Sequence, residues 1–247
     1  MGETTRMAVA GVEGLTRALE VKSNDLANTN TDGFKASHSQ FSEFLVKQKG
    51  GNTVPGGREE SYTEDRSVYQ DHMQGPMHQT GNLTDFAING EGYFSVRTSQ
   101  GVRLTRNGQF QRRADGTLTD SAGNPVLDTN SRNIVLRQQD EILSVASDGT
   151  ISTQEGRVAN IGLVTVDNLY TLQPEGNYLL RPTTQTRNVA NKEIRQGMLE
   201  SSNVNAVSEM THMITIQRDY DLNFQLVQTE STRQTNAIDK ITAEPNV

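Results

Sequence analysis

The feature that most constrains the fold of this chain is a long, regular repeat of apolar residues near the C-terminus. Between Ala206 and Ile241 the repeat advances by alternating steps of four and three residues, and eight of its eleven positions are apolar or aromatic. This spacing puts all of them on one stripe of an α-helix, as in the seam of a coiled coil. The seam positions are Ala206, Met210, Met213, Gln217, Tyr220, Phe224, Val227, Ser231, Gln234, Ile238 and Ile241.

We predict a single C-terminal helix over this repeat, on the order of 50 Å long at about 1.5 Å per residue. Asn203 and Asn205 are both suited to cap its start, since a short polar side chain accepts hydrogen bonds from the first free backbone N–H groups. Glu209 in the first turn suits the positive end of the helix dipole, and Pro245 ends the helix.

A shorter stripe near the N-terminus predicts a second helix. Its apolar positions are spaced by four, three and four residues, and Lys22 occupies the one polar position of the stripe. The helix should end between Asn28 and Gly33, because Asn and Asp-Gly residues favour turn geometry. The stripe consists of Ala8, Val12, Leu15, Leu19 and Leu26. A short apolar face after the turn consists of Phe34, Phe41, Phe44 and Leu45.

Residues 74–187 show a different pattern, in which short β-branched or aromatic runs are separated by turn residues. Asn-Gly and Asp-Gly pairs favour β-hairpins, because these residues tolerate the positive φ angles of tight hairpin turns. We therefore predict an all-β domain here. The pairs are Asn89-Gly90, Asn107-Gly108, Asp115-Gly116 and Asp148-Gly149. The predicted strands are Thr84–Ile88, Tyr93–Arg97, Val102–Thr105, Gly116–Thr119, Ile134–Leu136, Ile161–Val166 and Tyr178–Arg181.

Together these patterns predict an α+β chain. Residues 1–73 and 188–247 form a discontinuous terminal-helix domain of coiled-coil type, and residues 74–187 form a central all-β outer domain. Residues 47–73 are an extended linker within the first domain, because the run KGGNTVPGG is rich in Gly and Pro. Hydrophobic residues make up only 33% of the chain, so part of the apolar surface should need a partner. We expect the terminal helices to be weakly ordered in a monomer and to fold on assembly.

The sequence offers little for catalysis or for metal and cofactor binding. It has no Cys, which excludes thiol nucleophiles and thiolate metal sites, and it has no G-x-S-x-G motif. The four histidines lack the i, i+4 spacing of helical metal sites, although His72 and His78 could meet across a turn. The run GEGYF at residues 90–94 lacks the third glycine of a phosphate loop, which favours a hairpin. We predict no enzyme, no cofactor and no metal site.

Charge and hydropathy argue against two further classes of partner. The net charge of -7 opposes binding to nucleic-acid phosphates. A local cluster of positive charge lies among turn signals and is expected to be a solvated hairpin face. No apolar run approaches the roughly 20 residues that span a bilayer, and the first ten residues lack the apolar core of a cleavable secretory signal. The positive cluster is Arg103, Arg106, Arg112 and Arg113.

Several longer motifs resemble one known family. LANTNTDGFK, residues 26–35, is similar to the signature that follows the first helix of flagellar rod and hook proteins. GNLTDFAINGEGYFSV, LTRNGQF and DGTLTDSAGNPVL, all within residues 81–127, resemble the β-domain of that family. LESSNVNAVSEM and MITIQRDY, within residues 199–220, resemble its C-terminal signature. The signature residues are Asn28, Asn30, Gly33, Phe34, Ser202, Asn203 and Val204.

The resemblance implies a structural subunit of the bacterial flagellar rod in the periplasm, exported by the flagellar type III apparatus without signal cleavage. It implies as partners other copies of the chain, other rod proteins, the export apparatus and the ring proteins around the rod. The short connection between the first helical region and the β-domain favours the proximal rod over the distal rod. The alternative from another class is a secreted β-rich binding module with coiled-coil ends, such as an adhesin or a phage-tail component.

An open helical tube needs two different surfaces that meet on neighbouring copies, because a self-complementary surface closes into a dimer. The two apolar stripes differ in sequence, so we predict that they pack against each other, within one chain or between adjacent chains. Two-helix packing within one molecule is the simpler alternative. Polar positions of the stripes, Lys22, Gln217, Ser231 and Gln234, would set the register. The predicted interface is Ala8, Val12, Leu15, Leu19, Leu26, Met210, Met213, Gln217, Tyr220, Phe224, Val227, Ile238 and Ile241.

Overall fold

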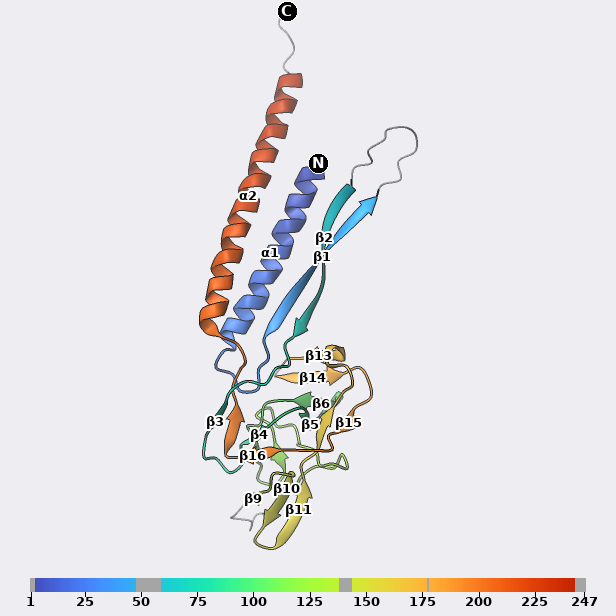
Figure 1. Ribbon diagram of the computed structural model, residues 1–247, viewed down its shortest axis with the longest axis vertical. Coiled ribbons are helices and arrows are strands. Elements are labelled where there is room, and N and C mark those ends of the chain that lie inside the picture. The colour runs from blue at the N-terminus through green and yellow to red at the C-terminus, as the bar shows by residue number, and fades with distance from the viewer. Residues whose placement is uncertain (1–2, 48–58, 138–143, 177, 243–247) are drawn as a thin grey trace, which may run out of the picture. The chain divides into compact units, whose positions relative to one another are not determined.

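The computed structural model describes residues 3–47, 59–137, 144–176 and 178–242 (Figure 1). Side chains are described for residues 9–39, 69–137, 144–176, 178–237, 239 and 240. The predicted α+β class is confirmed, with a mainly β central region and one helix near each end of the chain. The chain divides into two compact units: unit 1 is Met1–Ala27, Ser37–Tyr69 and Asn205–Val247, and unit 2 is Asn28–Ala36 and Gln70–Val204.

The helices of unit 1 are close to those predicted from the two apolar stripes. α1 spans Glu3–Ala27 and α2 spans Ala206–Thr242. They lie side by side and run antiparallel, with Lys22 of α1 opposite Glu209 of α2 (Figure 1). Asn205 is the cap of α2, because its side-chain oxygen accepts hydrogen bonds of 3.1 Å from two backbone N–H groups of the first turn. Among the described residues, no helix is long and apolar enough to cross a membrane.

Unit 1 also contains a two-stranded sheet of β1 (Ser37–Lys47) and β2 (Glu59–Gln70). β2 lies within the range that was expected to be an extended linker, residues 47–73. A strand forms here without an apolar pattern because its backbone pairs with β1, and because Tyr, Thr and Val residues in this segment favour strand geometry. The Gly- and Pro-rich run at residues 49–57 lies outside the described residues.

Unit 2 extends to Val204, beyond the limit of residue 187 that was predicted for the β domain. Two short strands account for the difference, and each pairs antiparallel with a strand more than 100 residues earlier. Such distant pairing has no local turn signal, so the sequence pattern did not reveal it. The pairs are β16 (Ile194–Gln196) with β4 (Phe86–Ile88), and β17 (Met198–Glu200) with β3 (Met77–Gln79).

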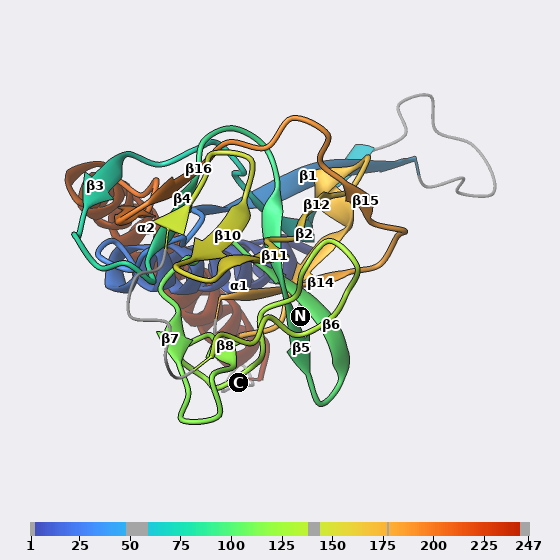
Figure 2. The same cartoon turned by 90° about the horizontal axis from the view of Figure 1, so that it is seen from below.

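The largest sheet of unit 2 has six antiparallel strands. In sheet order they are β13 (Leu172–Pro174), β14 (Leu179–Pro182), β6 (Gly101–Thr105), β5 (Tyr93–Thr98), β12 (Leu163–Thr165) and β15 (Arg187–Asn188). The central pair is a hairpin, in which Phe94 of β5 lies opposite Thr105 of β6. Figure 2 shows these two strands as neighbours joined by a tight turn.

Smaller sheets complete unit 2 and supply part of its core. β7 (Gln111–Arg112) pairs with β8 (Leu118–Thr119). A three-stranded sheet has the order β11 (Gly156–Asn160), β10 (Thr150–Thr153), β9 (Ser144–Val145), and a short 3-10 helix, η1, spans Leu169–Thr171. At the centre of the core, the Phe94 ring meets Phe110 edge to face with centroids 5.1 Å apart, and Phe86 lies 6.0 Å from Phe110.

Two of the four predicted hairpin pairs do connect paired strands. Asp115-Gly116 joins β7 to β8 and Asp148-Gly149 joins β9 to β10. Asn89-Gly90 and Asn107-Gly108 instead connect strands of different sheets. At Gly108 the requirement is space, because an added Cβ would lie 1.6 Å from the Phe86 carbonyl oxygen. The Asn-Gly pair therefore correctly indicated a position that requires glycine, but the predicted reason, a hairpin turn, was wrong.

Gly33 of the predicted turn makes a similar close approach, and this generates a test. Gly33 and Gly81 have nearly equal positive φ angles of 74° and 75°, but only Gly33 is crowded, since an added Cβ would lie 2.4 Å from the Asn107 backbone nitrogen. Gly81→Ala should cost about 1–2 kcal/mol, the penalty for left-handed geometry. Gly33→Ala should cost about 1–3 kcal/mol more through the steric clash. Urea unfolding monitored by circular dichroism measures both. Equal losses in the two variants would show that Gly33 does not lie against the backbone of Arg106 and Asn107 as described.

Candidate functional site

The face of α2 that α1 covers follows a regular four-three repeat. This covered repeat shares five positions with the predicted seam, but it contains Glu209, Ile216, Asn223 and Glu230 where the prediction had Met210, Gln217, Phe224 and Ser231. The two stripes are adjacent on the helix, and spacing alone does not determine which of them α1 covers. The shared positions are Ala206, Met213, Tyr220, Val227 and Gln234, all of them half-buried.

The buried residues of α1 lie beside the predicted N-terminal stripe and share only Lys22 with it. Ala18, Lys22 and Asp25 are buried. Four predicted interface residues of this helix, Val12, Leu15, Leu19 and Leu26, are half-buried. The simpler alternative, packing of the two helices within one molecule, therefore accounts for much of both stripes. The side chains of Ala8, Ile238 and Ile241 lie outside the described part of the chain.

A second apolar surface of α2 stays exposed in the single chain. We call it the outer face of α2 and define it as Val207, Met210, Ile214 and Phe224, which share one side of the helix and are 45–74% exposed. Large apolar side chains gathered on one helix and left in water are typical of an interaction surface. Phe224 stacks on Tyr220, with ring centroids 6.2 Å apart and ring planes 5° apart, so its ring is held in place while remaining accessible. Gln217 and Ser231 are also exposed.

α2 is also longer than its partner. It has 37 residues and α1 has 25, and the Lys22–Glu209 contact aligns the C-terminal end of α1 with the first turn of α2. The extra length of α2 therefore lies at its C-terminal end. That end includes the predicted interface positions 238 and 241.

A buried polar cluster sets the register of the two helices. Lys22 Nζ lies 3.0 Å from Glu209 Oε2 and 3.5 Å from Asp25 Oδ2. Both Asp25 oxygens accept from the Ser37 backbone N–H, at 3.0 and 3.1 Å. Burial raises the pKa of Asp25, although the Ser37 N–H and the Lys22 charge oppose the rise. Because a sliding helix would leave these charges unpaired, the cluster supports the predicted register role of Lys22.

A second buried cluster, centred on Glu200, brings the signature motifs of unit 2 together. Its carboxylate accepts from Lys35 Nζ at 2.6 Å, from Arg106 Nε at 2.5 Å and from the Gly75 N–H at 3.0 Å. Its backbone oxygen accepts from the Gly33 N–H at 2.7 Å. Burial lowers the pKa of Lys35, an effect that the Glu200 charge opposes. One residue thus joins segments that lie as much as 167 positions apart, from 33 to 200.

The structure corrects the interpretation of the arginine cluster. Arg103 and Arg106 are each only 7% exposed, whereas Arg112 and Arg113 are exposed as predicted. Arg106 is buried because its guanidinium also donates to the backbone oxygens of Ile88, Gly90 and Gly92. Those acceptors lie at the end of β4 and in the Gly-rich loop after it. No local sequence pattern indicates that this loop binds an arginine from another strand.

The remaining signature residues form the turns around this cluster. Asn28 accepts from the Thr31 hydroxyl at 3.2 Å, in the turn after α1. Asn30 is exposed and Phe34 is half-buried. Ser202 is buried and its hydroxyl accepts from the Val204 N–H at 3.2 Å. Glu200, Lys35 and Arg106 were not predicted as site residues, although all three lie inside the motifs that carry the family resemblance.

Comparison with known proteins agrees with these motifs. Residues 87–153 match the family model described as "Flagellar hook protein FlgE/F/G D1 domain", and residues 195–239 match "Flagellar basal body rod FlgEFG protein C-terminal". The flagellar basal-body rod protein FlgF of Caulobacter vibrioides is 36% identical over 232 residues, which cover 92% of this chain and 93% of that protein. The chain belongs to the flagellar basal-body rod protein family.

Other relatives carry both FlgF and FlgG names. FlgF of Mesorhizobium japonicum is 30% identical over 96% of this chain and 97% of its own length, and FlgG of Bacillus subtilis is 30% identical over 90% and 92%. This rod protein is therefore a structural component of the flagellar basal body, associated with motility, and not an enzyme.

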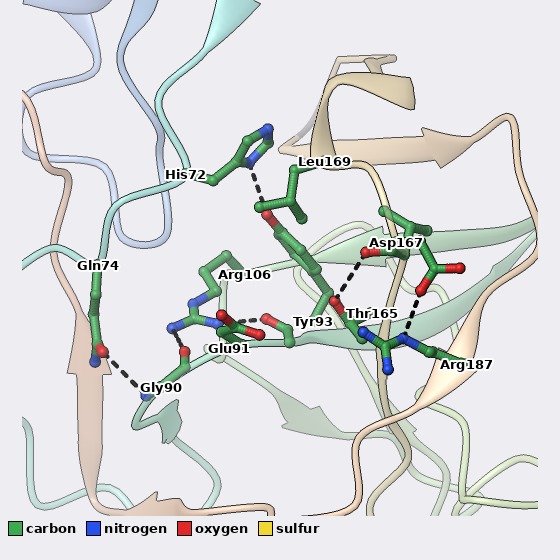
Figure 3. A pocket seen from close by; sticks show the side chains of 12 residues that line it. His72, Gln74, Gly90, Glu91, Tyr93, Arg106, Thr165, Asp167, Leu169 and Arg187 are labelled. Atoms are coloured by element: carbon green, nitrogen blue, oxygen red, sulfur yellow. Dashed lines mark hydrogen bonds and ion pairs between the residues drawn. The ribbon is translucent and has the colours of Figure 1, made fainter.

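A cavity of about 500 Å³ lies among the described residues of unit 2 (Figure 3). On its wall the Tyr93 hydroxyl lies 2.7 Å from His72 Nδ1. Burial raises the pKa of Tyr93 to about 12, so the phenol keeps its proton at neutral pH. Arg187 pairs with Asp167 at 2.9 Å, and Arg106 is already bound to Glu200 and backbone oxygens. The Tyr93, Arg106 and Arg187 side chains of the cavity are thus already paired. His72 and His78 do not form a metal site, and no group of three potential ligands occurs among the described residues.

Removing the charge of Glu200 tests the importance of the central cluster. Glu200→Gln keeps the size of the side chain but leaves the charges of Lys35 and Arg106 buried without a counter-ion, so we expect a loss of about 3–5 kcal/mol in the free energy of unfolding. The matched control is Glu193→Gln, which removes an exposed ion pair with Arg195 and should leave the urea midpoint almost unchanged. Similar midpoints for both variants would contradict the role assigned to Glu200.

The environment of His72 predicts a pH dependence. Burial and the Lys35 charge lower the pKa of His72, while Asp71 and a hydrogen bond to Leu169 oppose this. The unfolded chain therefore binds a proton near pH 6.5 that the folded chain does not bind, and stability should fall as the pH drops below about 6.5. Urea unfolding at pH 7.5 and 5.5 should show a smaller pH effect for His72→Gln than for wild type. The control His212→Gln, an exposed position on α2, should keep the wild-type effect. An unchanged pH effect in His72→Gln would contradict the assignment.

Proposed function

We propose that this chain is a proximal rod subunit that assembles helically through its terminal helices. The observation that carries the proposal is the outer face of α2, which stays uncovered while α1 already covers the adjacent stripe. Fully burying one large apolar side chain is worth about 1.5–3 kcal/mol. The four side chains of the outer face, each about half exposed or more, therefore provide several kcal/mol for contact with a neighbour.

The outward surfaces of the two helices differ, as an open assembly requires. α1 exposes charged residues, among them Glu13, Arg17 and Glu20, whereas α2 exposes the outer face. A neighbour that covers the outer face must therefore offer a different surface from the one that α1 exposes. Such heterologous contact propagates into a helical array instead of closing into a dimer.

The proposed assembly interface keeps the residues predicted from sequence and gives them two roles. Met210 and Phe224 would contact neighbouring subunits directly. Met213, Tyr220 and Val227, with the α1 stripe, would hold the helix pair that presents them. The outer face adds Val207 and Ile214 to the interface.

Placement in the proximal rod, and the partners, are further parts of the proposal. Similarity to proteins named FlgF, at up to 36% identity, and the short connection before the β region support the proximal position. Relatives named FlgG make a distal position the alternative. We propose other copies, other rod proteins, the type III export apparatus and the surrounding ring proteins as partners, in the periplasm. Labelling of the subunit in purified basal bodies should mark the proximal part of the rod, and a distal label would overturn the placement.

A charge on the outer face should block assembly without unfolding the subunit. Phe224→Asp places a carboxylate in the proposed contact, and we expect at least a tenfold drop in the amount of subunit found in purified basal bodies, together with loss of swimming. Thr229→Asp is the matched control, since Thr229 is also exposed on α2 but lies five residues from Phe224, roughly 140° around the helix. Circular dichroism should show wild-type helix content for both purified variants. Normal incorporation of Phe224→Asp would refute the proposed interface.

A further inference from the structure

The chain crosses between its two units four times, after residues 27, 36, 69 and 204. At three of these crossings, a residue of unit 2 lies within two positions of the boundary. These three residues belong to one hydrogen-bonded ring. These residues are Ala36, Asp71 and Asn203.

The ring is closed by the side chain of Asn203. Its oxygen Oδ1 accepts from the Ala36 N–H at 2.8 Å, and its nitrogen Nδ2 donates to the Asp71 backbone oxygen at 3.0 Å. The Asp71 N–H donates to the Ala36 backbone oxygen at 2.8 Å, which completes the ring. Nδ2 also donates to the Met73 oxygen at 3.2 Å, an oxygen that Lys35 Nζ reaches at 2.6 Å.

An asparagine is well suited to this position. The ring needs an acceptor for one N–H group and donors for two carbonyl oxygens on a short side chain, and a carboxamide supplies both. An aspartate of the same length has no donor for the two carbonyl oxygens. Asn203 is also not used as the helix cap, because Asn205 fills that role for α2.

We propose that Asn203 is a clamp that holds three of the four crossings together, so that load between the rod-forming helices and unit 2 is shared by three backbone segments. This role rests on the proposed function, in which the helices are built into a rotating rod. Without the clamp, each segment would carry load separately and would open locally more often. Asn203 is a positioning residue here, since it acts through Ala36 and Asp71.

Amide exchange in the full-length protein tests the clamp itself. In Asn203→Ala we expect the Ala36 amide to exchange about tenfold faster than in wild type, because its N–H loses the Asn203 Oδ1 acceptor. The Val126 amide, which donates to Leu118 within the core, should be unchanged. Gln196→Ala is the matched control: it removes another side-chain amide that bonds backbone groups, at Val145 and Leu83, away from the crossings. An unchanged Ala36 amide, or equal acceleration at Val126, would overturn the proposal.

Motility under load tests the consequence. Cells with Asn203→Ala should incorporate the subunit normally and swim normally in dilute medium, but should lose at least half of their relative speed in viscous medium. Gln196→Ala should match wild type in both media. Equal speed ratios for Asn203→Ala and wild type, or failure of Asn203→Ala to incorporate, would overturn load sharing. Absence of wild-type and Gln196→Ala subunits from the rod would instead contradict the proposed function, and the exchange result would stand independently.

Discussion

The structure of unit 1 depends on a mismatch between two helices. α2 carries large apolar residues on two adjacent stripes, and α1 covers only the stripe that contains Met213, Tyr220 and Val227. α1 is also shorter, with 25 residues against 37. Because water-exposed apolar surface is costly, we propose that another chain covers the outer face.

Buried charges give this otherwise generic helix packing its specificity. Apolar stripes alone would allow α1 and α2 to slide by a heptad, whereas Lys22 between Asp25 and Glu209 allows one register. In unit 2, Glu200 has the same effect on segments that are far apart in the sequence. Each cluster is stable only when all its members are in place, so each couples distant parts of the chain into one cooperative unit.

Local patterns predicted the local structure well. The two helices, the cap at Asn205 and the hairpins at Asp115-Gly116 and Asp148-Gly149 each follow from residues within a few positions of one another. The pairing of β16 with β4 and the burial of Arg106 depend on contacts across about 100 residues, and no short window of sequence contains that information. The α2 seam is an intermediate case. Its period was evident, but the choice between Glu209 and Met210 depended on where α1 packs.

Cross-linking in assembled rods tests the central claim most directly, namely that a neighbouring subunit covers the outer face of α2. The chain has no native Cys, so Met210→Cys gives a single reactive thiol on that face. With a short thiol-to-amine cross-linker, purified basal bodies should yield products between this subunit and another rod subunit, and the dilute monomer should not. Products confined to a single chain in intact basal bodies, or a thiol that remains fully reactive toward a water-soluble maleimide there, would contradict the account.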